Sequence, residues 1–201
     1  MRTSITILAC AAIAHAAVIN PRAGSVPEGP WTAGVWRKPI DDDVFFTGNA
    51  INASGGKFWV NRDTSAYCPE GIEGLDCTLY PGSKTVFAGG NNTISLSVSV
   101  PGGQQVYIAP DGALSYTQPH SAFMPNGSVV TGFSRTRSES FGAPVILGML
   151  GHSWLICPVG EGEPQEKTYQ LFILADSQKE GCYLTSVRTY TSSGLDAWEY
   201  V

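Results

Sequence analysis

Aromatic and amide side chains are the residues of this sequence whose types and spacing suit the recognition of a ligand. In "GKFWVNR" and in "VPGGQQVYIAPDGALSYT", strand alternation separates apolar side chains from rings and amides on the opposite face. Flat rings beside amides suit a polyol or a glycan. We therefore expect a binding surface of Trp59, Asn61, Gln105, Tyr107 and Tyr116. The alternative is that the rings pack under a loop or between two sheets.

Carboxylates are the second group that could do chemistry. A glycosidase needs two of them flanking a cleft, ~5–10 Å apart. The spacing along the chain pairs none of the candidates, and the aspartate of "APDGA" already has a role in a turn. No catalytic residue is therefore assigned, and a glycan-active hydrolase stays open as an alternative. The candidate residues are Asp63, Glu70, Asp76, Asp111, Asp196 and Glu199.

Other kinds of site lack their motifs. The chain contains neither of the glycine-rich loops that cradle phosphates, and "GHSWL" lacks the G-x-S-x-G turn of serine hydrolases. His120 follows a proline in an expected loop, where a solvated or backbone-bonded histidine is the ordinary case. The cysteine and histidine spacings do not match a zinc site, so no metal and no cofactor is expected. The formal net charge of −5 argues against nucleic acid or an anionic membrane surface as a partner.

The N-terminus has the features of a secretion signal. An apolar run, Ile5–Ile13, follows Arg2 and precedes a small-x-small cleavage pattern that ends at Ala16. The run is shorter than the ~20 residues that span a membrane. The C-terminal "LDAWEYV" is neither a lipid-anchor tail nor a retention signal. We expect residues 1–16 to be a signal peptide and the protein to be secreted, and we expect it to be a monomer.

Four cysteines follow the expected signal peptide. An even number in an oxidising compartment indicates disulfides. Three pairings can be drawn, and the short loops favour Cys68–Cys77 and Cys157–Cys182.

Three sequons for N-linked glycosylation support secretion independently. Each lies among turn residues, where glycans are accommodated. The asparagines are Asn52, Asn91 and Asn126.

Hydrophobic periodicity predicts strands from residue 41 onward. "TISLSVSV" alternates strictly, "TYQLFIL" is apolar on both faces as a central strand would be, and no long stretch has a helical period with caps. We expect one all-β domain over residues 41–201, folded as an antiparallel β-sandwich or a small closed barrel, with a β-trefoil-like fold as the alternative. Residues 17–40, interrupted by four prolines, are expected to form an irregular arm.

Two turns are predicted within "VPGGQQVYIAPDGALSYT". Pro101 and Gly102 suit the central positions of a type II turn, and Asp111 and Gly112 suit a hairpin turn between two strands. The whole stretch is therefore expected to be a β-meander rather than a phosphate-binding loop.

Four segments together resemble fungal secreted proteins of the IgE-binding or PhiA-type cell-wall family. They are "INASGGKFWVNRDTSAYCP", "VPGGQQVYIAPDGALSYTQPHS", "SWLICPV…YQLFIL" and "AWEYV", and the resemblance covers roughly residues 48 to 201. The order of motifs is more distantly similar to the C-terminal domains of yeast covalently linked cell-wall proteins. The resemblance implies a glycosylated, β-rich extracellular or cell-wall protein in which the Cys-Pro pairs are structural, and it supplies no catalytic residues.

We therefore expect a secreted protein of the cell wall or extracellular matrix that binds wall polysaccharide without catalysis. The glycan hydrolase is the first alternative. The second is a secreted effector or allergen whose partner is a host protein.

Overall fold

The computed structural model describes residues 25–38, 44–174 and 180–201, and these residues form mostly β-strands. The all-β prediction is confirmed, with the short 3₁₀-helix η1 (Cys77–Leu79) as the helix seen in these ranges. The expected signal peptide lies outside the described residues. The strands are β1 (Trp31–Arg37), β2 (Phe46–Ala50), β3 (Asn52–Ser54), β4 (Lys57–Val60), β5 (Ala66–Tyr67), β6 (Phe87–Leu96), β7 (Gln104–Ile108), β8 (Leu114–Tyr116), β9 (Phe133–Arg137), β10 (Val145–Met149), β11 (Trp154–Val159), β12 (Thr168–Ile173), β13 (Tyr183–Thr191) and β14 (Glu199–Tyr200).

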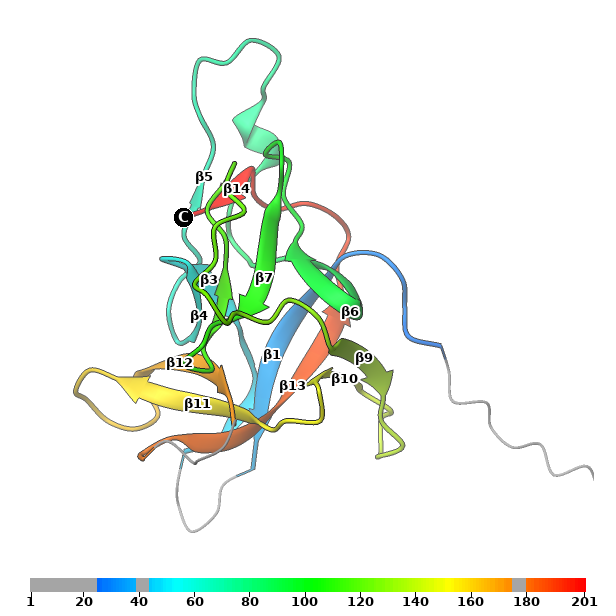
Figure 1. Ribbon diagram of the computed structural model, residues 1–201, viewed down its shortest axis with the longest axis vertical. Coiled ribbons are helices and arrows are strands. Elements are labelled where there is room, and N and C mark those ends of the chain that lie inside the picture. The colour runs from blue at the N-terminus through cyan, green and yellow to red at the C-terminus, as the bar shows by residue number, and fades with distance from the viewer. Residues whose placement is uncertain (1–24, 39–43, 175–179) are drawn as a thin grey trace, which may run out of the picture.

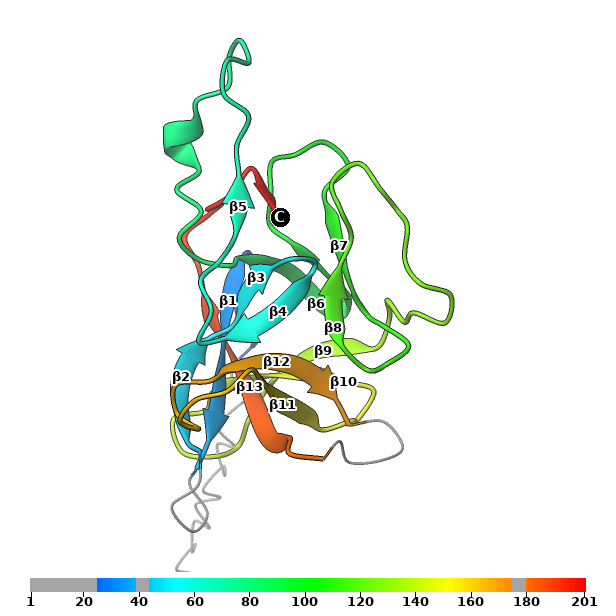
Figure 2. The ribbon, with the colours of Figure 1, turned by 90° about the vertical axis from the view of Figure 1, so that its left-hand side faces the viewer.

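Nine of these strands close into an antiparallel barrel (Figures 1 and 2). Around the ring the order is β6, β7, β8, β4, β12, β11, β13, β10 and β9, and β9 pairs again with β6. Closure depends on β13, where Leu184 faces Leu155 of β11 while Thr189 faces Val145 of β10. Of the predicted architectures, the closed barrel is therefore the one observed, and the sandwich and the trefoil-like fold are not.

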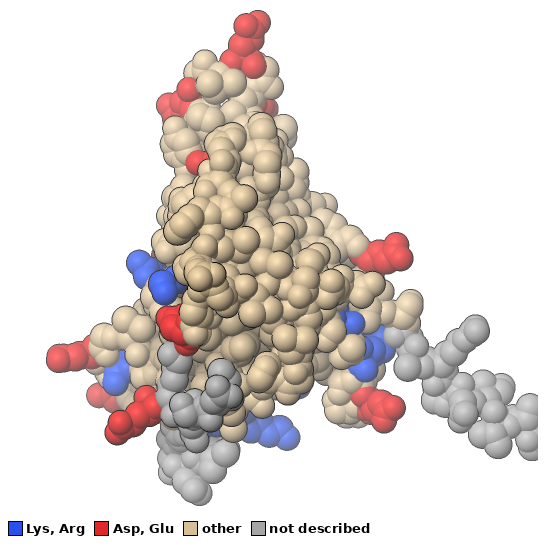
Figure 3. Space-filling view, in the orientation of Figure 1, with Lys and Arg blue, Asp and Glu red and all other residues tan. Residues whose placement is uncertain are grey.

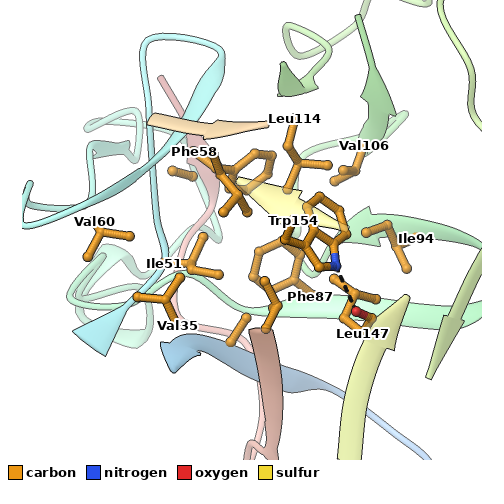
Figure 4. Packing of buried hydrophobic residues seen from close by; sticks show 14 of the residues in the cluster. Val35, Ile51, Phe58, Val60, Phe87, Ile94, Val106, Leu114, Leu147 and Trp154 are labelled. Carbon is orange, nitrogen blue, oxygen red and sulfur yellow. Dashed lines mark hydrogen bonds between the residues drawn. The ribbon is translucent and has the colours of Figure 1, made fainter. Parts of the chain in front are cut away.

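The barrel is filled by large apolar side chains. Aromatic rings from opposite parts of the chain meet inside it, with Phe58 next to both Phe87 and Tyr116 at 5.3 Å between ring centroids. Figure 4 shows this packing together with Trp154, whose indole Nε1 donates to the Leu147 carbonyl at 2.7 Å. The polar end of the indole is thereby satisfied within the core, as burial requires.

The segment predicted to be an irregular arm contains a core strand. Trp31–Arg37 form β1, which pairs along β13 and with β2, and the prediction of an irregular arm is wrong for these residues. Trp31 is fully buried, stacks on Phe87 at 4.6 Å, and donates its Nε1 proton to the Gly89 carbonyl. Trp31, Ala33 and Val35 alternate along "WTAGVWR" and are all buried, as in a strand with one face on the core. The prolines do not prevent strand formation, because they lie before and after the strand and leave its backbone donors intact.

The meander prediction is confirmed. The Gly103 N–H donates to the Val100 carbonyl at 3.0 Å with Gly102 at a φ of 86°, as a type II turn requires. Strands β7 and β8 then pair antiparallel. Between them Gly112 has a φ of 84°, and Asp111 accepts a hydrogen bond from the Ala113 N–H at 3.0 Å.

Both predicted disulfides are confirmed, as Cys68–Cys77 and Cys157–Cys182. The second lies in a small buried cluster beside Phe172, on the outer face of the barrel wall. The first closes a segment that projects away from the barrel after β5 (Figure 1). Acidic side chains mark the tip of this projection in Figure 3, while a broad face over β6 and β7 is nearly free of charge.

Candidate functional site

Tyr107 and Tyr116 line one shallow hollow on the barrel wall, which we call the tyrosine hollow. Strands β7 and β8 supply the two tyrosines, and residues of the turn between β3 and β4 and of the long loop after β8 complete the lining. Its volume is about 460 Å³, within the range of small-ligand sites. The lining residues are Gly55, Gly56, Lys57, Tyr107, Ala109, Pro110, Asp111, Ser115, Tyr116, Thr117, Gln118, Phe123 and Pro125.

Both tyrosines are buried, so neither presents an open ring face to the hollow. Tyr107 is 8% exposed and Tyr116 is 2% exposed, so the expectation that their rings form a binding surface is wrong, and the alternative that the rings are packed is the one observed. The Tyr116 ring belongs to the hydrophobic core and meets Phe58 edge to face. The Tyr116 hydroxyl donates to the Val201 carbonyl at 3.3 Å, whereas the Tyr107 hydroxyl has no hydrogen-bond partner among the described residues.

Burial extends the neutral form of both phenols to a higher pH than usual. It raises the pKa of Tyr116 to about 12, and burial followed by the charge of Asp111 raises the pKa of Tyr107. Both hydroxyls therefore stay protonated at neutral pH, and the Tyr107 hydroxyl can both donate and accept a hydrogen bond.

Three residues that the sequence did not indicate also line the tyrosine hollow. Lys57 lies at the start of β4, and no ion pair is recorded for it in the described part of the chain. Gln118 and Phe123 come from the loop after β8, where the Phe123 ring is 78% exposed. Lys57 could have been predicted as a site residue from its position on the same strand face as Trp59. Gln118 and Phe123 could not, because loop residues follow no periodic pattern.

A second hollow adjoins the first. Gln105 lies in it together with His120 and the turn at Pro101, and its volume is about 490 Å³. Thr117 lines both hollows, so they are neighbours along the end of β8. The Gln105 amide is held by the carbonyls of Ile94 and Val106 at 2.7 and 2.9 Å, which fixes it at the wall of this second hollow.

The other two residues of the predicted surface lie elsewhere. Trp59 is 8% exposed, donates to the Ser54 carbonyl at 2.8 Å and is covered by the Arg62 guanidinium at 4.7 Å from its ring. Asn61 is exposed, but its amide donates to the carbonyls of Gln165 and Lys167. Trp59 therefore joins β4 to the end of β3, and Asn61 joins the segment after β4 to the loop before β12. Neither residue lines the two hollows.

Several of the acidic candidates have hydrogen bonds that belong to turns. Asp196 is 4% exposed and accepts from the Lys84 N–H at 2.8 Å. Asp76 caps η1 through the Thr78 N–H and hydroxyl, and these bonds lower its pKa. Among the described residues that line the two hollows, the acidic one is Asp111.

The described residues form neither a metal-binding cluster nor a membrane-spanning helix. Within the described ranges, no cluster of three or more histidine, cysteine, aspartate or glutamate side chains is arranged to hold a metal ion. No helix in those ranges is both long enough and apolar enough to cross a membrane.

Two disulfides and a closed antiparallel barrel define this chain as an all-β domain of the extracellular type. The model of the PhiA-like secreted protein family matches residues 44–201, and the chain belongs to this family. An uncharacterized secreted protein of Arthroderma benhamiae is 35% identical over 159 residues, which cover 75% of this chain and 76% of that protein. No solved structure matches the chain. The protein is therefore a secreted one, as its sequence predicts.

Proposed function

We propose that this secreted protein binds a polysaccharide of the cell wall or extracellular matrix, without catalysis, through the tyrosine hollow and the hollow beside it. The observation that carries the proposal is that Tyr107, whose hydroxyl has no hydrogen-bond partner in the described residues, lines the same hollow as Lys57, Asp111 and Gln118. Groups of this kind bind sugar hydroxyls by direct hydrogen bonds.

The arrangement of the two hollows supports a chain-like ligand. They adjoin at Thr117, so neighbouring sugar units of one polysaccharide chain would contact both. The exposed Phe123 ring offers the apolar contact that the C–H face of a sugar needs. A shallow site of this type gives weak binding per unit, which suits a protein retained by many repeats of the same ligand.

The proposal that the protein is not an enzyme is supported by the use of its carboxylates. Asp111 has its Ala113 hydrogen bond in the hairpin turn, and Asp196 and Asp76 hold other turns. A two-carboxylate hydrolysis would need a second free acid beside Asp111 at ~5–10 Å.

Retention on insoluble polysaccharides tests the proposal. The protein is incubated with particulate β-glucan, chitin and mannan, and the bound fraction is compared for the wild type, Phe123→Ala and Phe141→Ala. Phe141 is fully exposed and lies outside both hollows, so it is the matched control. We expect retention on at least one polysaccharide, reduced several-fold by Phe123→Ala alone. No retention on any of the three overturns the proposal and favours a host-protein partner.

A further inference from the structure

The three sequons differ in how the fold presents their asparagines. The Asn52 side chain donates to the Arg62 carbonyl at 2.7 Å, so its amide is tied to the protein. Asn91 and Asn126 are exposed, and neither side chain has a hydrogen-bond partner among the described residues. Two amides are therefore free to carry a glycan in the folded protein.

Asn91 itself lines a hollow, whereas Asn126 lines none of those described above. This hollow, of about 480 Å³, lies between β6 and the segment that precedes β1. We call it the β6 hollow. Thr93, the third residue of the same sequon, also lines it. The lining residues are Val26, Pro27, Glu28, Gly29, Pro30, Ala88, Gly89, Gly90, Asn91, Thr93 and Arg135.

The floor of the β6 hollow depends on a glycine. Gly90 has a φ of 116°, and a Cβ at this position would lie 2.3 Å from Cδ of Arg135. A side chain here would displace the arginine, which crosses the glycine to reach the opposite wall. The absence of a side chain therefore leaves both the space and the arginine in place.

Arg135 fixes the far wall and retains donors for a ligand. Its Nη1 donates to the Pro27 carbonyl at 3.2 Å and its Nε donates to the Thr189 hydroxyl at 3.2 Å. The guanidinium also lies over the Trp31 ring at 4.9 Å, and burial lowers its pKa without removing its charge at neutral pH. A guanidinium has five N–H donors, so others remain for hydroxyl or acetamide oxygens.

We propose that an N-linked glycan on Asn91 rests in the β6 hollow, so that the protein binds the first sugar of its own modification. The free amide of Asn91 provides the attachment at the rim. Pro27, Pro30 and Ala88 provide apolar contacts for the sugar C–H groups, and Arg135 provides polar ones. The attached glycan would then hold the segment that precedes β1 against β6. This inference concerns another face of the barrel and does not rest on the proposed polysaccharide binding.

Secretion from a glycosylating host gives the first test. Enzymatic release in heavy-oxygen water, followed by peptide mass mapping, marks each asparagine that carried a glycan. We expect Asn91 to be occupied. An unmodified Asn91 in the secreted protein overturns the proposal.

Thermal unfolding gives the second test. Asn91→Gln is expected to lower the melting temperature by about 3 °C, a shift that corresponds to about 1 kcal/mol in a domain of this size. The matched variant Asn126→Gln removes an exposed sequon whose asparagine lines none of the hollows described above, and it is expected to leave the melting temperature unchanged. Trimming the wild-type glycan to its first N-acetylglucosamine should keep most of the stability, because that sugar is the one in contact.

Expression in a second host distinguishes the effect of the glycan from the effect of the asparagine side chain itself. In protein made by a host that does not glycosylate, Asn91→Gln and the wild type should melt together. Equal melting temperatures of Asn91→Gln and Asn126→Gln in the glycosylating host contradict the proposal. So does an equal effect of Asn91→Gln on the melting temperature in both hosts.

Discussion

The Gln104 side chain pairs with the backbone of Tyr200 as a neighbouring strand would. Its Nε2 donates to the Tyr200 carbonyl at 2.8 Å, and its Oε1 accepts from the Tyr200 N–H at 2.8 Å. A further bond from Nε2 reaches the Thr117 carbonyl at 3.1 Å. One buried amide therefore joins β7, the end of β8 and β14, and it fixes the wall on which the two candidate binding hollows lie.

Replacing this amide should be costly. Gln104→Leu keeps a similar volume but leaves three buried backbone groups without their partner, so we expect a loss of about 3 kcal/mol of unfolding free energy. Urea unfolding followed by fluorescence measures it. The exposed Gln118 is the control, and Gln118→Leu should change stability by less than about 0.5 kcal/mol. Similar losses in both variants would show that the Gln104 bonds are not what holds the C-terminal strand.

The place of β1 in the barrel gives the second prediction. Trp31→Ala removes a fully buried ring and its bond to Gly89, and should cost about 4 kcal/mol. Trp36 is the same residue type on the same strand and is only partly buried, so Trp36→Ala should cost no more than half as much. Calorimetric unfolding compares the two. A negligible effect of Trp31→Ala on the unfolding free energy would contradict the place of β1 in the core and indicate a loosely attached arm.

The two disulfides are expected to differ in their effect on global stability. Cys157–Cys182 has a sequence separation of 25 and lies in a buried cluster, and its removal should cost about 3–4 kcal/mol on the chain-entropy model. Cys68–Cys77 closes the projecting segment, which can loosen without opening the barrel, so its removal should cost less than about 1 kcal/mol. Urea unfolding of two variants, each with both cysteines of one disulfide replaced by serine, measures the two losses of unfolding free energy. A larger loss for the Cys68–Cys77 variant would refute this order.

Alkaline pH should destabilise the fold through its buried tyrosines. Tyr116 has an ordinary pKa of 10.0 when unfolded and one of about 12 when folded, because burial disfavours the phenolate. The folded state therefore holds this proton more tightly. Its contribution is fully present below pH 10 and is lost as pH rises towards 12, amounting to about 2–3 kcal/mol.

Burial raises the pKa of Tyr200 as well, so it adds to the same alkaline loss. Tyr107 has a raised pKa too, so Tyr116→Phe removes one of three contributions. It should make stability fall less steeply above pH 10, measured by urea unfolding across that range. Tyr67→Phe changes a ring that is 52% exposed and serves as the control. Identical profiles for the wild type and Tyr116→Phe would contradict this account.

Local chemistry made part of this fold predictable. The turns at Gly102 and Gly112 follow from residue types that favour one backbone conformation. The inward positions of Phe58 and Val60 follow from alternation along β4. The cysteine pairing followed from proximity, since the shorter loops close more readily.

Long-range closure could not be predicted in the same way. The pairing of β10 with β13 depends on contacts between distant segments that no local pattern encodes. The alternation of Trp31, Ala33 and Val35 was present in the sequence, but the surrounding prolines concealed it. Tyr107 is buried and lines a hollow together with residues of the loop after β8, and strand alternation alone predicts neither its burial nor these neighbours.

The most direct test of the proposed function is a titration of the protein with soluble oligosaccharides cut from the polysaccharide that retains it. Calorimetry gives the dissociation constant for the wild type, for Tyr107→Phe and for Tyr67→Phe. Loss of the free Tyr107 hydroxyl should weaken binding about tenfold, as one hydrogen bond of about 1.4 kcal/mol would, while Tyr67→Phe should bind like the wild type. Equal affinities for the wild type and Tyr107→Phe would place the ligand elsewhere and contradict the proposed site.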